Sequence, residues 1–431
     1  MASFEEKEMA KYLHPADMAE ILRGLSPEKR KAFFDSLNPE VGAMVLRELD
    51  PISESELLAE LDNREISEIL DEMPSDDAAD IVADLSKEKA DQVLQLMEEE
   101  ESTDVKKLLK YKEDTAGGIM TTEFVALNQE LNIEEALQLL RKRIEPGPIH
   151  YIYVVDDAQK LLGVLLIKKL IASGPDIKLK EIMNRDIINV HTDVDQEEVA
   201  RIVSKYDLLA IPVVDHQDRL VGIVTVDDVI DVIEEEDSED IFRMAGTDDE
   251  ELSKKSIFRI AQIRLPWLAI TLLGGLISCG LLKTFQFTLE KVLALVFFVP
   301  VIMGMGGNIG IQSSTIVVRG LATGNINLSR LGKVLLKEVR IGAIMGLACG
   351  ITVGTIAYFL ERGLTLGIVV GISLFIAITV AATMGALVPL IFKRLKIDPA
   401  IASGPFVTTS NDITGLIIYF ILANWLFRIF G

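Results

Sequence analysis

The sequence predicts a multidomain membrane protein, with an all-α transmembrane domain of five helices behind a cytosolic α-helical superhelical domain and a cytosolic α/β domain pair. Five apolar runs after Ile257 each reach the roughly 20 residues needed to cross a hydrocarbon core. Charge is divided unevenly, because 61 acidic and 29 basic residues precede Ile257 whereas five acidic and fourteen basic residues lie in 257–431. The two parts have formal net charges of −32 and +9. We expect a helical N domain at 1–113, the α/β pair at 114–236, an acidic connecting (plug) helix at 237–262 and the transmembrane domain at 263–431.

The acidic balance of the first part restricts its partners. A surface of this charge repels nucleic acid and anionic lipid and attracts cations, so we expect divalent cations and no nucleic acid as partners. Cys279 and Cys349 both lie in apolar runs and offer neither a disulfide framework nor a zinc cluster, which fits a reducing cytosolic setting. No basic segment followed by an apolar core opens the chain, so no cleavable signal peptide is expected. The four histidines are scattered and no nucleophile–base pair is visible, so we do not expect an enzyme.

Residues 1–112 have a helical pattern throughout. Short stretches with apolar residues at helical spacing are separated by breaks in which a cap residue or a proline marks the next helix start, at 25–27, 37–39, 49–51 and 73–75. A faint internal repeat relates Asp17–Ser26 to Asp77–Ser86, and it predicts a small stack of helix pairs. The acids of the second copy are most simply a solvated face, and direct cation binding is the alternative.

From Thr115 onward, short β-type runs alternate with helical patterns. Ile152–Leu165 is echoed by Ile211–Val224, and an Ile-Met pair opens each copy at 119 and at 182. Each copy reads as a strand, a turn and a strand, followed by a helix, which we expect at 168–172 and at 227–235. This stretch resembles a tandem pair of cystathionine-β-synthase (CBS) domains over about 119–236.

In the CBS family a Thr or Ser and an Asp three residues later meet the ribose of an adenine nucleotide. The resemblance places these residues at Thr225 and Asp228 in the second copy, whereas Leu166 and Lys169 stand at the matching positions of the first. At most one nucleotide site per chain, for ATP, is therefore implied. The alternative is that Asp228 only caps the helix that it begins, because Asp near a helix N-terminus is favourable without any ligand.

An acidic segment, 227–240, follows the second copy and leads toward the first span. Two unit charges 4 Å apart in a medium of effective dielectric about 20 repel by roughly 4 kcal/mol. Divalent ions that bridge several such pairs could supply the free energy that switches a two-state assembly. We therefore expect this segment to sense cations, and a linker that serves only solubility is the alternative.

The five spans are expected at roughly 263–284, 291–318, 341–360, 364–392 and 399–428. Twelve Lys and Arg flank them on the side of the large N-terminal part and only four on the other side. The excess of positive charge predicts that the N-terminal domains are cytoplasmic and that the C-terminus lies outside, in a multi-pass protein of the cell membrane.

Polar residues interrupt the second and the fifth span. In 300–315 glycines permit close backbone approach, and Asn308 brings an amide to membrane depth. In 405–415 Asp412 is the only charge within 399–427, and a carboxylate at the bilayer centre costs at least roughly 2.5–3.5 kcal/mol. Polar helix packing explains one such span, but two in a small bundle favour a shared water-accessible path. Asp412 is our leading candidate for a cation ligand.

The complete arrangement resembles the MgtE family of magnesium channels over essentially the whole chain. The motifs that support the resemblance are 300–313, Leu336–Glu338, Asp398–Pro399 and Ser410–Leu416. The resemblance implies a homodimer in the lipid bilayer, a pore lined by the second and fifth spans, and closure of the channel when cytosolic Mg2+ binds the acidic domains. The implied pore and ion-binding residues are Asp412, Asn308, Thr408, Asn411 and Gly307. The implied sensor positions are Glu197, Asp207, Asp228, Asp231, Glu236, Glu239, Asp240 and Asp398, with Asp76, Asp77 and Asp80 nominated on a looser match.

Two other functions compete with a magnesium channel. An ion-coupled secondary Mg2+ transporter or exchanger would also use an intramembrane carboxylate, but five spans without an obvious inverted repeat count against it. A CBS-regulated anion channel would need basic residues in its pore, and the middles of all five spans lack Lys and Arg.

Overall fold

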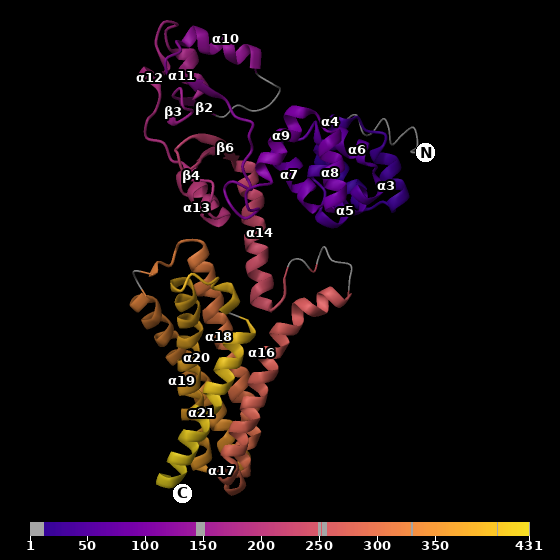
Figure 1. Cartoon of the computed structure of the whole chain (residues 1–431). Coiled ribbons are helices and arrows are strands. Elements are labelled where there is room, and N and C mark those ends of the chain that lie inside the picture. The colour runs from indigo at the N-terminus through magenta and orange to yellow at the C-terminus, as the bar shows by residue number, and fades with distance from the viewer. Residues whose placement is uncertain are drawn as a thin grey trace. The chain divides into compact units, whose positions relative to one another are not determined.

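The chain divides into two compact units, Met1–Glu234 and Glu235–Gly431. The computed structural model describes residues 13–143, 151–248, 251, 257–328, 331–402 and 404–430. Figure 1 shows short helices and two small sheets in the first unit and long helices in the second. The predicted fold class, a helical domain, an α/β pair and a five-helix transmembrane domain, is confirmed.

The helical domain consists of short helices that begin at cap residues and prolines. They are α2 (Pro15–Arg23), α3 (Pro27–Phe34), α4 (Pro39–Arg47), α5 (Pro51–Glu60), α6 (Asn63–Leu70), α7 (Ser75–Asp84), α8 (Lys87–Leu96) and α9 (Glu99–Leu108). The side chain of Asn38 accepts a hydrogen bond from the backbone N–H of Val41, and Asp50 does the same for Ser53, each at 3.0 Å. Helix α2 packs on α4, α4 on α6 and α6 on α8, which produces the predicted stack.

Two three-stranded sheets form the α/β pair, and they have the same topology. Their strands are β1 (Ala126–Asn128), β2 (Ile152–Val155) and β3 (Leu161–Leu165), then β4 (Val190–His191), β5 (Ala210–Val214) and β6 (Leu220–Thr225). In each sheet the first pairing is parallel and the second antiparallel. The helices of the pair are α10 (Ile133–Arg143), α11 (Ile167–Ala172), α12 (Leu179–Ile182), α13 (Gln196–Tyr206) and the start of α14 (Val226–Ala245). The repeat seen in the sequence is therefore a repeat of structure.

The segment that opens each copy packs into the other copy. A side chain built on Gly222 would collide with the thioether of Met120, and one on Gly163 would collide with that of Met183. Backbone hydrogen bonds of 2.8–3.0 Å join the same segments, Thr121 with Ile223 and Asn184 with Val164. The two copies thus exchange equivalent elements and share one interface.

Helix α14 contains the whole acidic segment, 227–240. The helix expected at 227–235 continues to Ala245, because neither glycine nor proline occurs before Gly246. Gly246 has a φ of +79°, a value that glycine adopts without the steric cost that other residues meet. The helix therefore ends at this glycine, and α16 (Ile257–Thr284) lies further along the second unit.

The second unit contains five helices that are long and apolar enough to cross a membrane, counted over the described residues. Its elements are α16, α17 (Gln286–Lys291), η1 (Leu293–Phe298), α18 (Val299–Ala322), α19 (Leu331–Glu361), α20 (Leu364–Arg394), η3 (Ala400–Ala402) and α21 (Pro405–Phe430). Helices α18 to α21 lie side by side, and α17 lies at the same end of the bundle as the C-terminus (Figure 1). Three expected starts change by six residues or more. Helix α16 begins at Ile257, not 263, and α19 begins at Leu331, not 341. Helix α21 begins at Pro405, not 399, because that proline fits the first turn of a helix.

Helices α19 and α20 meet backbone to backbone along a row of glycines. Gly346, Gly350 and Gly354 of α19 face α20, where a Cβ added to them would lie 2.6–2.8 Å from carbonyl oxygens. Small residues are what permits such close packing in a membrane, where the hydrophobic effect does not drive helices together. Among the described helices of the unit, this pair has the most extensive contact.

We predict that Gly346→Val lowers the stability of the second unit by roughly 1–3 kcal/mol, because the valine would force the helices apart. The measurement is the thermal-denaturation midpoint of the detergent-solubilised chain. Gly332→Val on the same helix is the matched control, since an added Cβ there meets nothing within 4 Å. Equal midpoints for the two variants would contradict the packing argument.

Candidate functional site

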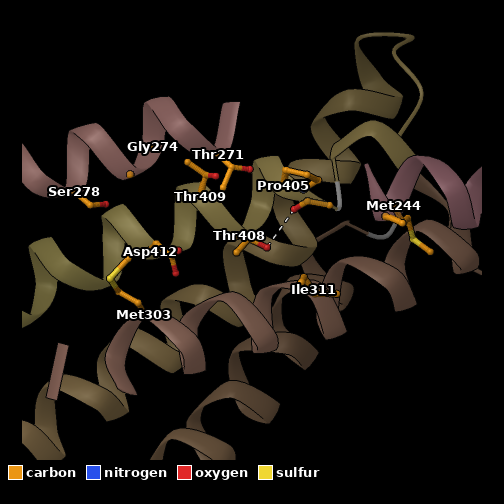
Figure 2. Close-up of a pocket in the computed structure, with 13 residues that line it drawn as sticks. Met244, Thr271, Gly274, Ser278, Met303, Ile311, Pro405, Thr408, Thr409 and Asp412 are labelled. Atoms are coloured by element: carbon orange, nitrogen blue, oxygen red, sulfur yellow. Dashed lines mark hydrogen bonds between the residues drawn. The ribbon is translucent and has the colours of Figure 1, made fainter. Parts of the chain in front are cut away.

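A cavity of about 550 Å³ lies among α16, α18 and α21 of the second unit and is bounded by the end of α14. Figure 2 shows that the hydroxyl side chains of Thr271 and Ser278 come from α16, while Thr408 and Thr409 come from α21. The volume exceeds the roughly 180 Å³ that six waters occupy in the liquid. A hydrated ion of that size therefore fits.

Asp412 is the only charged residue among those that line the cavity, in the part of the chain that the structure describes. It is half-buried, and no described lysine or arginine pairs with it. A Cβ on Gly307 of α18 would lie 3.6 Å from its Oδ1, so the glycine lets the two helices approach beside the carboxylate. Thr408, one turn earlier, donates from Oγ1 to the carbonyl of Gly404 at 3.3 Å (Figure 2).

The two asparagines proposed for the pore lie outside this cavity. Asn411 is 2% exposed and packs against Gly306 and Gly310 of α18, and its Nδ2 has no hydrogen-bond partner among the described residues. Asn308 lies on an exposed face of α18. Of the pore set, Asp412 and Thr408 therefore line the cavity, Gly307 lies behind them, and the asparagines face elsewhere.

Sequence reasoning missed the contribution of the first span. Thr271 and Ser278 are separated by seven residues on α16, with Gly274 between them, so all three lie on one face of the helix. A Cβ on Gly274 would overlap the side chain of Thr409, which places this face directly against α21. The signal was present as a row of small polar residues in an otherwise apolar run.

Acidic residues of the first unit gather around Arg47, the last residue of α4. Its Nε lies 3.0 Å from Asp77 Oδ2 on α7, and its Nη2 lies 3.4 Å from Asp228 Oδ1 and 3.5 Å from Asp227 Oδ2, both in the first turn of α14. Asp76, the neighbour of Asp77, is 7% exposed, and no described group donates a hydrogen bond to its Oδ1. Two of the predicted sensor residues, Asp77 and Asp228, are therefore brought together.

Burial governs the protonation of this acidic cluster. It raises the pKa of Asp77 to about 6, although the guanidinium of Arg47 lowers it, and it raises the pKa of Asp76 well above the ordinary value. Burial also raises the pKa of Asp228, against the hydrogen bonds from Thr225. Nearby, on α5, burial and then the charges of Asp84, Asp77 and Asp50 raise the pKa of Glu54 to about 7.

The two predicted nucleotide residues contact each other. Thr225 ends β6, and both its hydroxyl and its backbone N–H, the latter at 3.3 Å, donate to Asp228 Oδ2. Asp228, the third residue of α14, thus accepts from the residue that precedes the helix, as the acid of a capping box does. The position of Asp228 is compatible with both predicted roles, the nucleotide contact and the helix cap.

A second set of predicted sensor residues meets at the C-terminal half of α14. Arg243 forms ion pairs with Glu239, one turn earlier, and with Asp398, which lies before α21. Asp398 also accepts a hydrogen bond of 2.8 Å from the backbone N–H of Ala400. Asp237 pairs with Arg319 of α18. Glu236 and Asp240 are half-buried on the same helix.

The remaining sensor residues are dispersed. Glu197 lies in the first turn of α13 and Asp207 caps its end, so at 1.5 Å rise per residue they are roughly 15 Å apart. Asp231 lies one turn beyond Asp228, and Asp80 is exposed on α7. Across the described residues, no three His, Cys, Asp or Glu side chains are arranged to hold a metal ion. The predicted sensor residues therefore form several separate groups.

Models of known protein families match three parts of the chain. The model described as the MgtE intracellular N domain matches 13–114, that of the CBS domain matches 116–174 and 179–235, and that of MgtE, a divalent cation transporter, matches 299–422. Each match falls on a part of the structure with the corresponding architecture.

Related proteins extend this similarity. The magnesium transporter MgtE of Thermus thermophilus is 41% identical over 317 residues, which cover 73% of this chain and 70% of that protein. The magnesium transporter MgtE of Enterococcus faecalis is 36% identical over 319 residues, covering 74% and 70%. A solved structure of the cytosolic domain of the Mg2+ channel MgtE in complex with ATP is 40% identical, with a TM-score of 0.50, and covers 52% of this chain and 93% of that one.

The raised pKa of Glu54 predicts how the stability of the first unit depends on pH. Because the folded state holds this proton up to about pH 7, against an ordinary value of 4.5, stability is lost as the pH rises through that window. We expect Glu54→Gln to stabilise the unit by about 1–2 kcal/mol more at pH 8 than at pH 5.5. Calorimetric unfolding of the purified chain at both pH values is the measurement, with the exposed Glu60→Gln as control. A gain that is equal at both pH values would refute the assignment.

Proposed function

Because the chain belongs to the MgtE family of magnesium transporters, we propose that it is a Mg2+-selective channel that admits magnesium across the cell membrane and closes when cytosolic Mg2+ binds its acidic domains. The observation that carries this proposal is the unpaired carboxylate of Asp412 in a cavity between three spans, where four hydroxyl side chains are part of an otherwise apolar lining. A carboxylate at membrane depth that faces a cavity inside the helix bundle is typical of an ion pathway.

Asp412 would bind the ion through its water shell. Mg2+ gives up water reluctantly and keeps several waters when one or two carboxylates hold it. The hydroxyls of Thr271, Thr408 and Thr409 can accept hydrogen bonds from those waters. Few direct ligands favour release, which conduction requires.

We propose that two copies of the chain form the pore. One Asp412 supplies a charge of −1, whereas two on a symmetry axis would balance Mg2+. Asn308 supports this arrangement, because its amide lies on an exposed face of α18 and next to Gly304, where an added Cβ meets nothing within 4 Å. A polar side chain on a membrane helix is stabilised by a polar partner, and the same face of a second copy would provide one.

The end of α14 supports a gating role for the acidic helix. Met244 and Ala245 line the cavity, and a side chain on Gly404 would collide with the carbonyl of Met244. Glu236, Glu239 and Asp240 lie one to two turns earlier on the same helix. Cations that bind these carboxylates would therefore act on a segment that closes one end of the cavity.

We place the soluble domains in the cytoplasm and the C-terminus outside. The excess of Lys and Arg in the loops on the side of the N-terminal part supports this orientation. We also place one ATP site in the second CBS domain at Thr225 and Asp228. The solved cytosolic domain in complex with ATP, 40% identical to this chain, supports a nucleotide site in the soluble domains.

Flux measurements separate a channel from an exchanger. We expect Mg2+ uptake into liposomes that contain the chain without any counter-ion gradient. Uptake that requires a proton or Na+ gradient, or that saturates at low Mg2+, would instead establish coupled transport.

We predict that Asp412→Asn abolishes Mg2+ binding in the cavity and reduces uptake at least about tenfold while the chain remains folded, because the amide keeps the shape and loses the charge. Uptake into liposomes and the elution profile of the purified chain are the measurements. Glu361→Gln, an exposed acid at the end of α19, controls for loss of one negative charge. Normal uptake by Asp412→Asn would exclude this pore.

We predict that the triple variant Glu236→Gln, Glu239→Gln and Asp240→Asn continues to conduct at high cytosolic Mg2+. The neutral side chains would hold no divalent ion, so the end of α14 would no longer respond to it. The dependence of flux on Mg2+ at the cytosolic side is the measurement. Inhibition equal to that of the parent chain would leave these residues with a solubilising role only.

A further inference from the structure

The predicted sensor carboxylates come together at two places in the structure, and an arginine pairs with them at each place. Arg47 reaches from the helical domain to Asp77 on α7 and to Asp227 and Asp228 at the start of α14, at 3.0–3.5 Å. Its side chain is 35% exposed, so solvent ions have access to the group. The guanidinium therefore links the helical domain to the CBS pair. A metal ion bound to the same carboxylates would link the same two domains.

Arg243 holds the equivalent place in the second unit. It pairs with Glu239 on its own helix and with Asp398 before α21, so it ties the end of α14 to the base of the fifth span. Both carboxylates belong to the sensor set predicted from the sequence. The two arginines come from different elements and lie in different units.

A guanidinium and a magnesium ion compete for these carboxylate oxygens. Mg2+ requires oxygens, from carboxylates or water, at about 2.0–2.1 Å in octahedral geometry, and a cation beside it would be repelled. Arginine offers planar N–H donors to the same oxygens and remains charged at every physiological pH. Around Arg47, three carboxylates face one positive charge, so the group keeps a net negative charge that attracts a divalent ion while the arginine is still bound. Replacement of the arginine by Mg2+ is therefore an exchange of one cation for another.

We propose that Arg47 and Arg243 occupy the magnesium-sensing carboxylates when cytosolic Mg2+ is low, and that Mg2+ must displace them before it can close the channel. This inference rests on the proposed gating function. It makes the arginines determinants of the Mg2+ concentration at which the channel closes, because the carboxylates that pair with them must release a guanidinium before they bind the ion.

The test compares arginine variants in the full-length chain reconstituted in liposomes, with Mg2+ varied on the cytosolic side. Arg47→Gln and Arg243→Gln remove the competing charge, so we expect the half-inhibitory Mg2+ concentration to fall roughly threefold to tenfold in each variant. Arg47→Lys and Arg243→Lys keep the charge and should stay near the parent value. Arg64→Gln, an exposed residue of α6 paired with Glu68 on the same helix, controls for net charge.

The outcomes separate this inference from the gating proposal. If the parent chain is inhibited by Mg2+ and the glutamine variants close at the same or at higher Mg2+, the arginines are structural ties and the competition is disproved. If the parent chain shows no inhibition, both proposals fail. A shift of equal size in Arg64→Gln would assign the effect to overall charge and would also overturn the inference.

Discussion

A carboxylate that leaves bulk water must meet a cation, a proton or hydrogen-bond donors, and this chain carries far more carboxylates than cations. Different carboxylates of the structure have different partners. Asp50 and Asp398 accept backbone N–H groups, while Asp77 and Asp228 face Arg47. Asp412 has none of these partners among the described residues. The carboxylate of Asp412 is therefore left without an internal partner at the cavity, and a passing cation is the partner that would stabilise it there.

The transmembrane unit combines one stiff contact with one looser one. Glycines bring α19 and α20 together at backbone distance, whereas only 11% of the apolar window of α16 is buried, against 50% for α20. The cavity lies on the side of α16. Interdigitated backbones resist displacement, while a helix held by fewer contacts can move at small cost. The α19–α20 pair therefore forms a rigid part of the unit, whereas α16, which lines the cavity, can move more easily.

The sequence was sufficient for the fold class because its signals were local or repeated: prolines at helix starts, two echoing strand pairs and five long apolar runs. Asp412 could be found for the same reason, since a lone charge in an apolar run is visible without a structure. Arg47 could not be found, because its partners are 30 and about 180 residues away and an arginine at a helix end is ordinary. Thr271 and Ser278 were missed because two hydroxyls in an apolar helix are also common. Whether Asn308 faces the cavity or the outside of the unit depends on how the helices pack, and the spacing of residues in the sequence does not predict this.

The exchange of segments between the two CBS copies also has a consequence for synthesis. Thr121 forms its backbone hydrogen bonds with Ile223, so the first copy lacks a partner for its opening segment until about 100 further residues have been added. At about 5–20 residues per second the ribosome needs roughly 5–20 s to supply them. During that interval Met120, which is 2% exposed in the folded protein, has no Gly222 to pack against. The helical domain, whose contacts join neighbouring helices, can fold as it emerges, whereas the CBS pair must fold as one unit at a later stage of translation.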